Sequence, residues 1–347
     1  MPFATPRRFP PLLFVIIVAL LPAGRILGDL VWTPETGWEI QGGVLSGLIG
    51  VEGRNAIDLM NKARAAEEKG RYGTASSDYE KVAKKYPNSI WAPEAYYRAG
   101  HVRLLRKQYD KAFEDYQHII STYPSTTRFN EVIGLQYRVA AALLNGAKGR
   151  IFWSLLPGIF TARDRGIEFC EQILVNAPYS DYAPLALMEV VAGQQWLGHT
   201  EESIDALDRF INNYPQSIMA PDAYIKLAQA NASLVDGPYY DQTSTNEAIT
   251  YYQDFMILFP GDHNVAIAEK GLADMKTVLA QSKIKIADFY FYKRSNYVAA
   301  RVFYNEAITA YPDSDVANLA KKRLAAVEAA AAKAKNSPPH KKFLGIF

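Results

Sequence analysis

The sequence has very little cysteine and no excess of charge of either sign. Cys170 is the only cysteine among 347 residues, so the chain can form no internal disulfide bond and no zinc site built on cysteines. Residues 1–28 hold three of the 38 Lys and Arg and none of the 36 Asp and Glu, which leaves 35 basic against 36 acidic residues in the remainder. A nucleic-acid-binding domain usually carries a basic stripe. This balance therefore argues against a nucleic-acid partner.

Catalytic and metal-binding motifs are also missing from the sequence. The histidines are few and scattered, and none falls in an HExxH or similar metal-ligand spacing: His101, His118, His199, His263 and His340. No Gly-x-Ser-x-Gly elbow is present, and Cys170 has no histidine pattern beside it that would suggest a nucleophile. We therefore expect a protein that is not an enzyme and that needs no cofactor and no metal.

The first 28 residues have the layout of an export signal. Arg7 and Arg8 precede the apolar run at residues 11–23, and the first acidic residue is Asp29. A basic segment followed by a short apolar run is typical of a secretory signal peptide, and the run is shorter than the roughly 20 apolar residues that a transmembrane helix needs. Residues 1–28 are thus expected to be a signal peptide or an uncleaved N-terminal anchor.

A phrase of the sequence occurs twice, 128 residues apart. Residues 84–100 read KKYPNSIWAPEAYYRAG and residues 212–228 read NNYPQSIMAPDAYIKLA. The phrase belongs to a series of prolines that follow Tyr, Ala or Phe at intervals of 37, 54, 37, 45 and 52 residues: Pro87, Pro124, Pro178, Pro215, Pro260 and Pro312. A unit of 34 to 37 residues with insertions indicates a helical repeat array.

The residues upstream of each proline predict how the helices pack. The position twelve residues before the proline is always small: Ala75, Ala112, Gly166, Ser203, Ala248 and Ala300. The position eight residues before it is large and apolar or is Cys170: Tyr79, Tyr116, Cys170, Leu207, Tyr252 and Tyr304. Residues four apart lie on one helix face, so these pairs are expected in the core. The proline ends the helix, and Ser89, Ser180, Ser217 and Ser314 are expected to cap the next one.

The unit resembles the tetratricopeptide repeat, and residues 93–126 are its best copy. The predicted fold is all-α: a tetratricopeptide-type helical array, or α-solenoid, of about five to six helix pairs over residues 54–335. Residues 29–53 are expected to form an extended leader, and residues 336–347 a flexible basic tail. Insertions interrupt the array at 145–165 and 236–245. The first is interpreted as a flap folded back on the array or as a finger that contacts a partner or a membrane, and the second as a longer loop. The lack of turn signals between Val265 and Tyr292 predicts one long helix.

The block IADFYFYKRSNYVAARVFYNEAITAYPDS, residues 286–314, resembles the C-terminal repeats of the BamD family. Members of that family are noncatalytic subunits of the machine that assembles β-barrel proteins into the bacterial outer membrane. The resemblance implies a protein-binding scaffold in the periplasm, associated with the outer membrane. Its implied partners are a barrel-assembly subunit with periplasmic domains and unfolded outer-membrane protein segments.

Two features keep an alternative open. Family members are usually tethered by a lipidated N-terminal cysteine, whereas the only cysteine here is Cys170, so membrane association would come from the N-terminal segment or from a partner. The Tyr-Pro-x-Ser joints are also similar to those of the CpoB family of periplasmic adaptors in cell-wall organisation. That family has a coiled coil before its repeats, and no sustained heptad pattern is present here.

The sequence offers two candidate binding sites. Phe289, Tyr292 and Arg294 form one stripe of a helix whose other stripe, near Ile284 and Phe291, is expected to pack into the array. Aromatic residues and arginine anchor protein interfaces, so we expect the first stripe to bind the partner unless the terminal Ala-rich helix covers it. The second candidate is a peptide groove on the inner face of the first helices, formed by three residues: Arg64, Tyr97 and His101.

Overall fold

The computed structural model describes residues 29–41, 51–147 and 162–336, and its helices divide into two compact units. Unit 1 ends at Thr127 and unit 2 begins at Arg128. The expected signal or anchor at 1–28, most of the 145–165 insertion and the tail after Asn336 lie outside the described residues.

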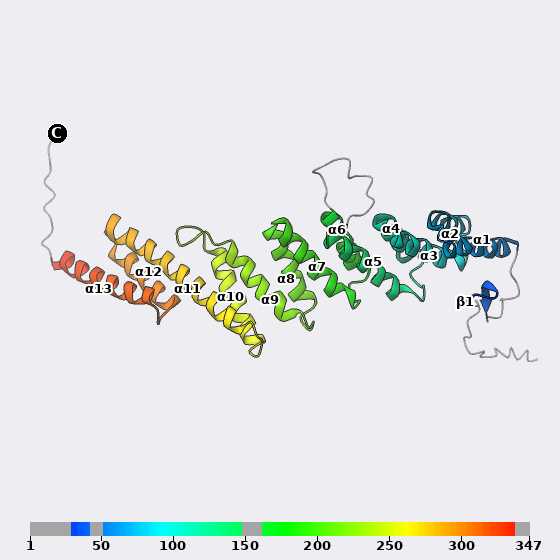
Figure 1. Cartoon of the computed structure of the whole chain (residues 1–347). Coiled ribbons are helices and arrows are strands. Elements are labelled where there is room, and N and C mark those ends of the chain that lie inside the picture. The colour runs from blue at the N-terminus through cyan, green and yellow to red at the C-terminus, as the bar shows by residue number, and fades with distance from the viewer. Residues whose placement is uncertain (1–28, 42–50, 148–161, 337–347) are drawn as a thin grey trace, which may run out of the picture. The chain divides into compact units, whose positions relative to one another are not determined.

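The described residues of unit 1 form a β-hairpin and four helices. The hairpin pairs β1 (Asp29–Thr33) with β2 (Gly37–Gln41) in antiparallel register. The helices follow in chain order: α1 (Val51–Glu68), α2 (Tyr72–Lys85), α3 (Trp91–Leu105) and α4 (Tyr109–Thr122). Each helix packs against the next, and α1 also contacts α3 and β2 (Figure 1). The leader predicted before the array thus contains a hairpin, and the array begins at Val51.

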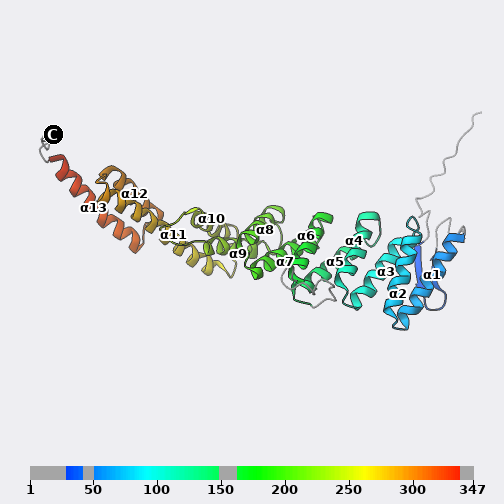
Figure 2. The same ribbon diagram turned by 90° about the horizontal axis from the view of Figure 1, so that it is seen from above.

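Within unit 2, consecutive described helices again pack against one another (Figure 2), and two of those near its C-terminal end are the longest, with 24 and 22 residues. Its first helices are α5 (Phe129–Leu144), α6 (Ala162–Asn176), α7 (Tyr182–Leu197), α8 (Thr200–Asn213), α9 (Ala220–Ser233) and α10 (Thr243–Leu258). The last are α11 (Val265–Asp288), the π-helical turn η2 (Phe289–Lys293), α12 (Tyr297–Ala310) and α13 (Asp315–Asn336). Helices α5 and α7, α9 and α11, and α11 and α13 also touch. Pairs of antiparallel helices whose first members contact one another form a tetratricopeptide-type array.

The proline series marks the helix ends as predicted. Each even-numbered helix from α2 to α12 ends two residues before its proline, for example at Lys85 before Pro87 and at Ala310 before Pro312. Proline restricts the preceding residue to non-helical backbone, which fixes the end of the helix at that point. In two joints a tyrosine also donates its hydroxyl to the proline carbonyl of the preceding joint, Tyr123 to Pro87 and Tyr214 to Pro178.

The packing positions are in the core as predicted. The six small residues and the six larger ones are all buried, and Tyr252, the most exposed of the larger ones, is only 4% exposed. Gly100 shows why small residues are needed, because a Cβ atom there would lie 2.6 Å from the ring of Tyr116. The small residue twelve positions before each proline therefore lets two helices approach closely, and the large residue eight positions before it fills the space between them.

The capping role predicted for the joint serines is correct only in part. Ser314 accepts a bond from the Ala317 N–H at 3.1 Å and so caps α13, whereas Ser217 accepts only from the N–H of Met219 at 3.3 Å, which precedes the first residue of α9. Ser89 and Ser180 donate instead to backbone carbonyls three residues earlier. The turn after the proline brings that carbonyl within reach of the hydroxyl. The serine side chain therefore bonds within the joint instead of capping the next helix.

The long helix predicted from Val265 is present, with 24 residues in α11 and the π-helical turn continuing it. The expected loop at 236–245 ends earlier than predicted, since α10 begins at Thr243. Gln242 ties this loop together by donating to the carbonyls of Gly237 and Tyr240. Within the described part of the chain, no helix is both long and apolar enough to cross a membrane, and no cluster of metal-ligating side chains occurs.

Candidate functional site

The last three helices form a small core that positions the predicted partner-binding residues. Ile284 and Ala287 of α11 pack with Tyr304 of α12 and Val327 of α13, and Phe291 lies partly buried against them. This is the side of the helix that the sequence predicts to face the array. It leaves the opposite side of α11 and η2 outside the core.

A polar cluster ties the end of α11 to both following helices. Asp288 accepts hydrogen bonds from the Tyr304 hydroxyl at 2.5 Å and from the Arg323 guanidinium. Burial and the bond to Asp288 raise the pKa of the Tyr304 phenol above its usual range, so this donor keeps its proton at any physiological pH. Asp288 is the last residue of α11, so the cluster stands where the α-helix gives way to the π-helical turn.

The predicted stripe lies at the surface directly after this cluster. Phe289 is 46% exposed and Tyr292 is 64% exposed, and the Arg294 guanidinium lies 5.4 Å from the Phe289 ring centre. Helix α13 packs on α11 and α12 but leaves Phe289 and Tyr292 uncovered. The alternative, in which the Ala-rich terminal helix buries this stripe, is not found in the described residues: Val327 of α13 packs into the core with Ile284 and Tyr304, while Phe289 and Tyr292 stay exposed.

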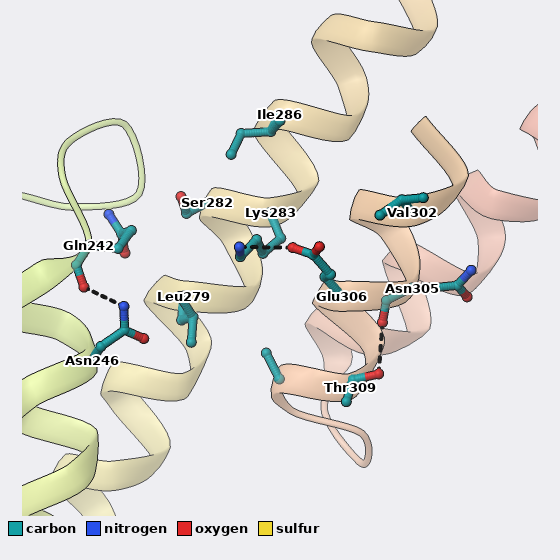
Figure 3. A pocket seen from close by; sticks show the side chains of 11 residues that line it. Gln242, Asn246, Leu279, Ser282, Lys283, Ile286, Val302, Asn305, Glu306 and Thr309 are labelled. Carbon is teal, nitrogen blue, oxygen red and sulfur yellow. Dashed lines mark hydrogen bonds and ion pairs between the residues drawn. The ribbon is translucent and has the colours of Figure 1, made fainter. Parts of the chain in front are cut away.

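A groove that the sequence did not predict lies beside the stripe. It has a volume of about 720 Å³ and is lined by residues of α10, α11 and α12 (Figure 3). Lys283 of α11 and Glu306 of α12 meet across it at 2.8 Å. Ile286 and Val302 line it and are 36% and 50% exposed. Such exposed apolar residues are a weak signal in a sequence, because single ones are normal on any protein surface.

The groove lies along α11 on the side that leads to Phe289, the first residue of the stripe. Leu279 and Ile286 line the groove, and they are seven residues apart, which is two helical turns. Phe289 follows Ile286 by three residues and therefore stands next to it on the helix surface. The arrangement is a partly apolar groove with one ion pair, and the exposed ring of Phe289 follows its lining residue Ile286.

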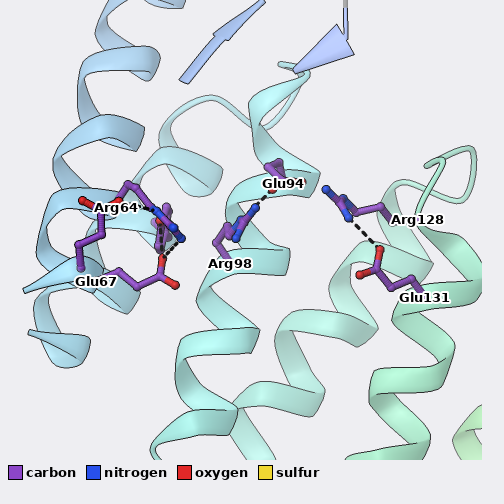
Figure 4. A network of polar contacts seen from close by, with 8 residues as sticks. Arg64, Glu67, Glu94, Arg98, Arg128 and Glu131 are labelled. Atoms are coloured by element: carbon purple, nitrogen blue, oxygen red, sulfur yellow. Dashed lines mark hydrogen bonds and ion pairs between the residues drawn. The ribbon is translucent and has the colours of Figure 1, made fainter. Parts of the chain in front are cut away.

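The second predicted site, in unit 1, is already in contact with the hairpin. Arg64 is bound to Glu67 and Glu68 and lies 4.3 Å from the ring centre of Trp32 (Figure 4). Tyr97 and His101 are half-buried on α3, and Arg98 beside them lies over the rings of Tyr97 and Trp38. The part that these residues play in peptide binding stays a prediction. What the sequence did not show is that the chain itself covers Arg64.

Residues 166–338 match the YfiO family, described as an outer membrane lipoprotein, and residues 59–89 and 94–126 match the tetratricopeptide repeat. Two curated relatives are outer membrane protein assembly factors BamD of Xylella fastidiosa. The protein of strain 9a5c is 22% identical over 154 residues, which cover 42% of this chain and 52% of that protein. The protein of strain Temecula1 is 21% identical over the same length. The chain thus spans about half the length of the curated relatives it matches.

Solved tetratricopeptide-repeat structures are also similar to this chain. One from Parabacteroides merdae is 12% identical, covers 80% of this chain and all of that one, and has a TM-score of 0.32. One from Thermus thermophilus is 16% identical, covers 63% of this chain and 99% of that one, and has a TM-score of 0.29. These scores are low. The repeat fold is shown by the family match and by the helix pairs described above.

Proposed function

Because the chain is a BamD-like tetratricopeptide-repeat protein, we propose that it is a noncatalytic periplasmic scaffold in the assembly and insertion of outer-membrane β-barrel proteins. The single observation that carries this proposal is the position of the family match. Residues 166–338 include every residue of the stripe Phe289, Tyr292 and Arg294 and every residue that lines the neighbouring groove. The most BamD-like part of the chain is thus the part with an exposed aromatic surface.

We propose that this surface binds a barrel-assembly subunit with periplasmic domains. Phe289 and Tyr292 together with Ile286 offer apolar area, and Arg294 adds a planar cation already stacked on a ring. Aromatic and arginine side chains contribute most of the binding energy of many interfaces because they bury a large area and keep a polar end. Association with the outer membrane then comes from this partner or from the N-terminal segment.

The first test is recovery of the partner. The full chain with an affinity tag is purified from an envelope extract, and co-purifying proteins are identified by mass spectrometry. We expect a large β-barrel protein with periplasmic domains. Recovery of cell-wall synthesis proteins without any such protein would contradict the proposal and would favour the CpoB-type adaptor.

The second test locates the interface. The double variant Tyr292→Ala, Arg294→Glu should bind the recovered partner at least tenfold more weakly, which corresponds to a loss of about 1.4 kcal/mol. Its folding stability should stay within about 1 kcal/mol of wild type because both side chains are exposed. The matched control is Tyr179→Ala, Arg301→Glu, which makes the same changes at exposed positions of unit 2 outside the stripe. Equal binding by the two double variants would rule out the stripe.

A further inference from the structure

The hairpin of unit 1 presents two tryptophans to the helices. Trp32 and Trp38 are directly opposite each other in the register of β1 and β2. Trp38 is only 3% exposed, and its backbone N–H donates to Asn61 Oδ1 of α1 at 2.6 Å. An isolated two-stranded hairpin is marginally stable in water, so these contacts with the helices are what hold it in place.

The helices meet the tryptophans with two arginines that are themselves fixed. Arg64 of α1 lies 4.3 Å from the ring centre of Trp32, and Arg98 of α3 lies 5.1 Å from that of Trp38. Glu94 holds Arg98 at 2.9 Å, in the way that Glu67 and Glu68 hold Arg64 (Figure 4). Each guanidinium is therefore oriented by carboxylates and lies over an indole ring, which is a favourable cation–π arrangement.

These contacts all belong to one face of unit 1. Asn61 and Arg64 are three residues apart on α1 and therefore lie on the same face of the helix, while their neighbours Met60 and Ala63 are fully buried. On α3, Glu94 and Arg98 are four residues apart, so they lie on the same face of the helix. This face has a carbonyl acceptor for a peptide N–H and two oriented cations for aromatic rings, which are groups that recognise an extended peptide.

Gly37 allows the hairpin to come this close. Its φ is +74°, and a Cβ atom there would lie 2.7 Å from Asn61 Oδ1, the same atom that accepts the Trp38 N–H. Any side chain at this position strains the backbone and displaces Asn61. The fit between the hairpin and α1 therefore depends on one glycine, and it can be broken without changing either tryptophan or any residue of the helix face.

We propose that the face formed by Asn61, Arg64 and Arg98 is a binding site for an extended peptide segment containing aromatic residues, and that the hairpin, residues 29–41, occupies it in the resting protein. An external segment of the same chemistry binds there by displacing the hairpin. Only residues 42–50 separate the hairpin from α1 along the chain. The hairpin therefore has a high effective concentration at this site, and a weakly binding external peptide cannot displace it. This site lies in unit 1, and it does not depend on the outer-membrane partner proposed for unit 2.

The test uses the full chain and the synthetic peptide DLVWTPETGWEIQ, which is residues 29–41 with a fluorescent label. Binding is measured by fluorescence anisotropy for the wild type and for Gly37→Val, in which the internal hairpin is released. We expect Gly37→Val to bind the peptide at least tenfold more tightly than the wild type does. The matched control is Gly198→Val, a glycine with a similar φ of +80° and nothing within 4 Å of its Cβ position, which should bind like the wild type.

Two further measurements decide where the peptide binds. Adding Arg64→Ala and Arg98→Ala to Gly37→Val should abolish the gain, and a peptide with both tryptophans replaced by alanine should bind at least tenfold more weakly to Gly37→Val. Equal binding by wild type and Gly37→Val, or binding that survives loss of both arginines, would overturn the proposal. If circular dichroism shows that Gly37→Val has lost helix, Trp38→Ala releases the hairpin by removing its buried anchor, and the same outcomes apply to it.

Discussion

At the scale of single residues, the repeat is a rule about side-chain volume. The position eight residues before each proline is filled by Tyr, Leu or Cys, and all six side chains are buried. The chemistry of the group matters less than its fit, because Cys170 takes the position of a tyrosine and is buried like one. Such a rule can be found in the sequence because the proline gives a fixed reference point for each unit.

Tyr116 tests the rule at a position where the fit is closest. Its side chain is fully buried and its ring lies against Gly100, so Tyr116→Ala should leave a cavity and lower the free energy of unfolding by about 3–5 kcal/mol. Denaturant unfolding followed by circular dichroism measures the loss. The control Tyr179→Ala removes a side chain that is 98% exposed and should change stability by less than about 0.5 kcal/mol. Similar values for the two variants would contradict the assigned repeat register.

Cys170 should be chemically inert in the folded protein. Its side chain is buried, and burial raises the pKa of its thiol well above the usual range, with a further contribution from Glu189. Since only the thiolate reacts with disulfide reagents, we expect no reaction with Ellman's reagent under native conditions. One thiol per chain should react in guanidinium chloride. Rapid labelling of the native protein would show that this position opens to solvent.

Asp115 should make stability depend on pH. Burial raises the pKa of its carboxyl to about 7, against the opposing effect of Arg103, which binds both Asp115 and Glu80. An aspartate in an unfolded chain titrates near pH 4, so between about pH 4 and pH 7 the folded protein holds a proton that the unfolded chain has released. This contribution is fully present below pH 4 and is lost as the pH rises through 7.

The comparison with Asp115→Asn isolates this effect. An amide does not titrate, and the pH-dependent contributions of all other titratable groups to the free energy of unfolding are the same in the two proteins. From pH 5 to pH 8, the wild type should lose at least about 1 kcal/mol more unfolding free energy than the variant does. Urea unfolding at the two pH values measures the difference. An equal loss in both proteins would mean that Asp115 is ionised throughout.

At the scale of secondary-structure elements, the ends of the helices were easier to predict than the hydrogen bonds of the joints and the hairpin that packs on the first helices. Proline acts through its own covalent geometry, so each proline of the series marks the same point of a joint. The serines were harder, because Ser89 finds its acceptor in a turn whose shape the sequence does not state. The hairpin at 29–41 was missed for a related reason. Its strands are short, and Trp38 is stabilised by Asn61, 23 residues further along the chain.

The candidate sites show the same division. The exposure of Phe289 and Tyr292 could be predicted, because the helical period decides which side of α11 is left over once Ile284 and Ala287 pack inward. The adjoining groove could not, because it depends on the spacing between α10 and α12 on either side of α11. The helical period of the sequence predicts on which side of a helix a side chain lies, but it does not predict the distance from that helix to the next one.

Asp288 should be the residue that connects the last three helices. It accepts bonds from Tyr304 of α12 and Arg323 of α13, so Asp288→Ala should lower the free energy of unfolding by about 1–3 kcal/mol. The loss should be accompanied by faster proteolysis within α13, since Arg323 is one of the attachments of that helix. Asp313→Ala, at an exposed position of the following joint, is the control and should have neither effect. Unchanged proteolysis of α13 in Asp288→Ala would show that apolar packing alone holds the helix.

At the scale of the whole molecule, the two candidate sites belong to different compact units. The site under the hairpin uses α1 and α3 of unit 1, and the stripe and groove use α10 to α12 of unit 2. In a repeat array each repeat contacts only its neighbours, so stability and binding are approximately sums of local terms. Substitutions at the two sites should therefore act independently unless the array transmits a change along its length.

The triple variant Gly37→Val, Tyr292→Ala, Arg294→Glu tests this independence. It should bind the hairpin peptide as tightly as Gly37→Val alone, within about twofold, and it should bind the unit 2 partner as weakly as the stripe variant alone. Anisotropy with the labelled peptide and co-purification of the partner measure the two terms in the same preparation. If release of the hairpin changes partner binding by tenfold or more, the two sites share a free energy of at least about 1.4 kcal/mol. Occupation of the site under the hairpin would then regulate the C-terminal surface, because the coupling between two binding sites acts equally in both directions.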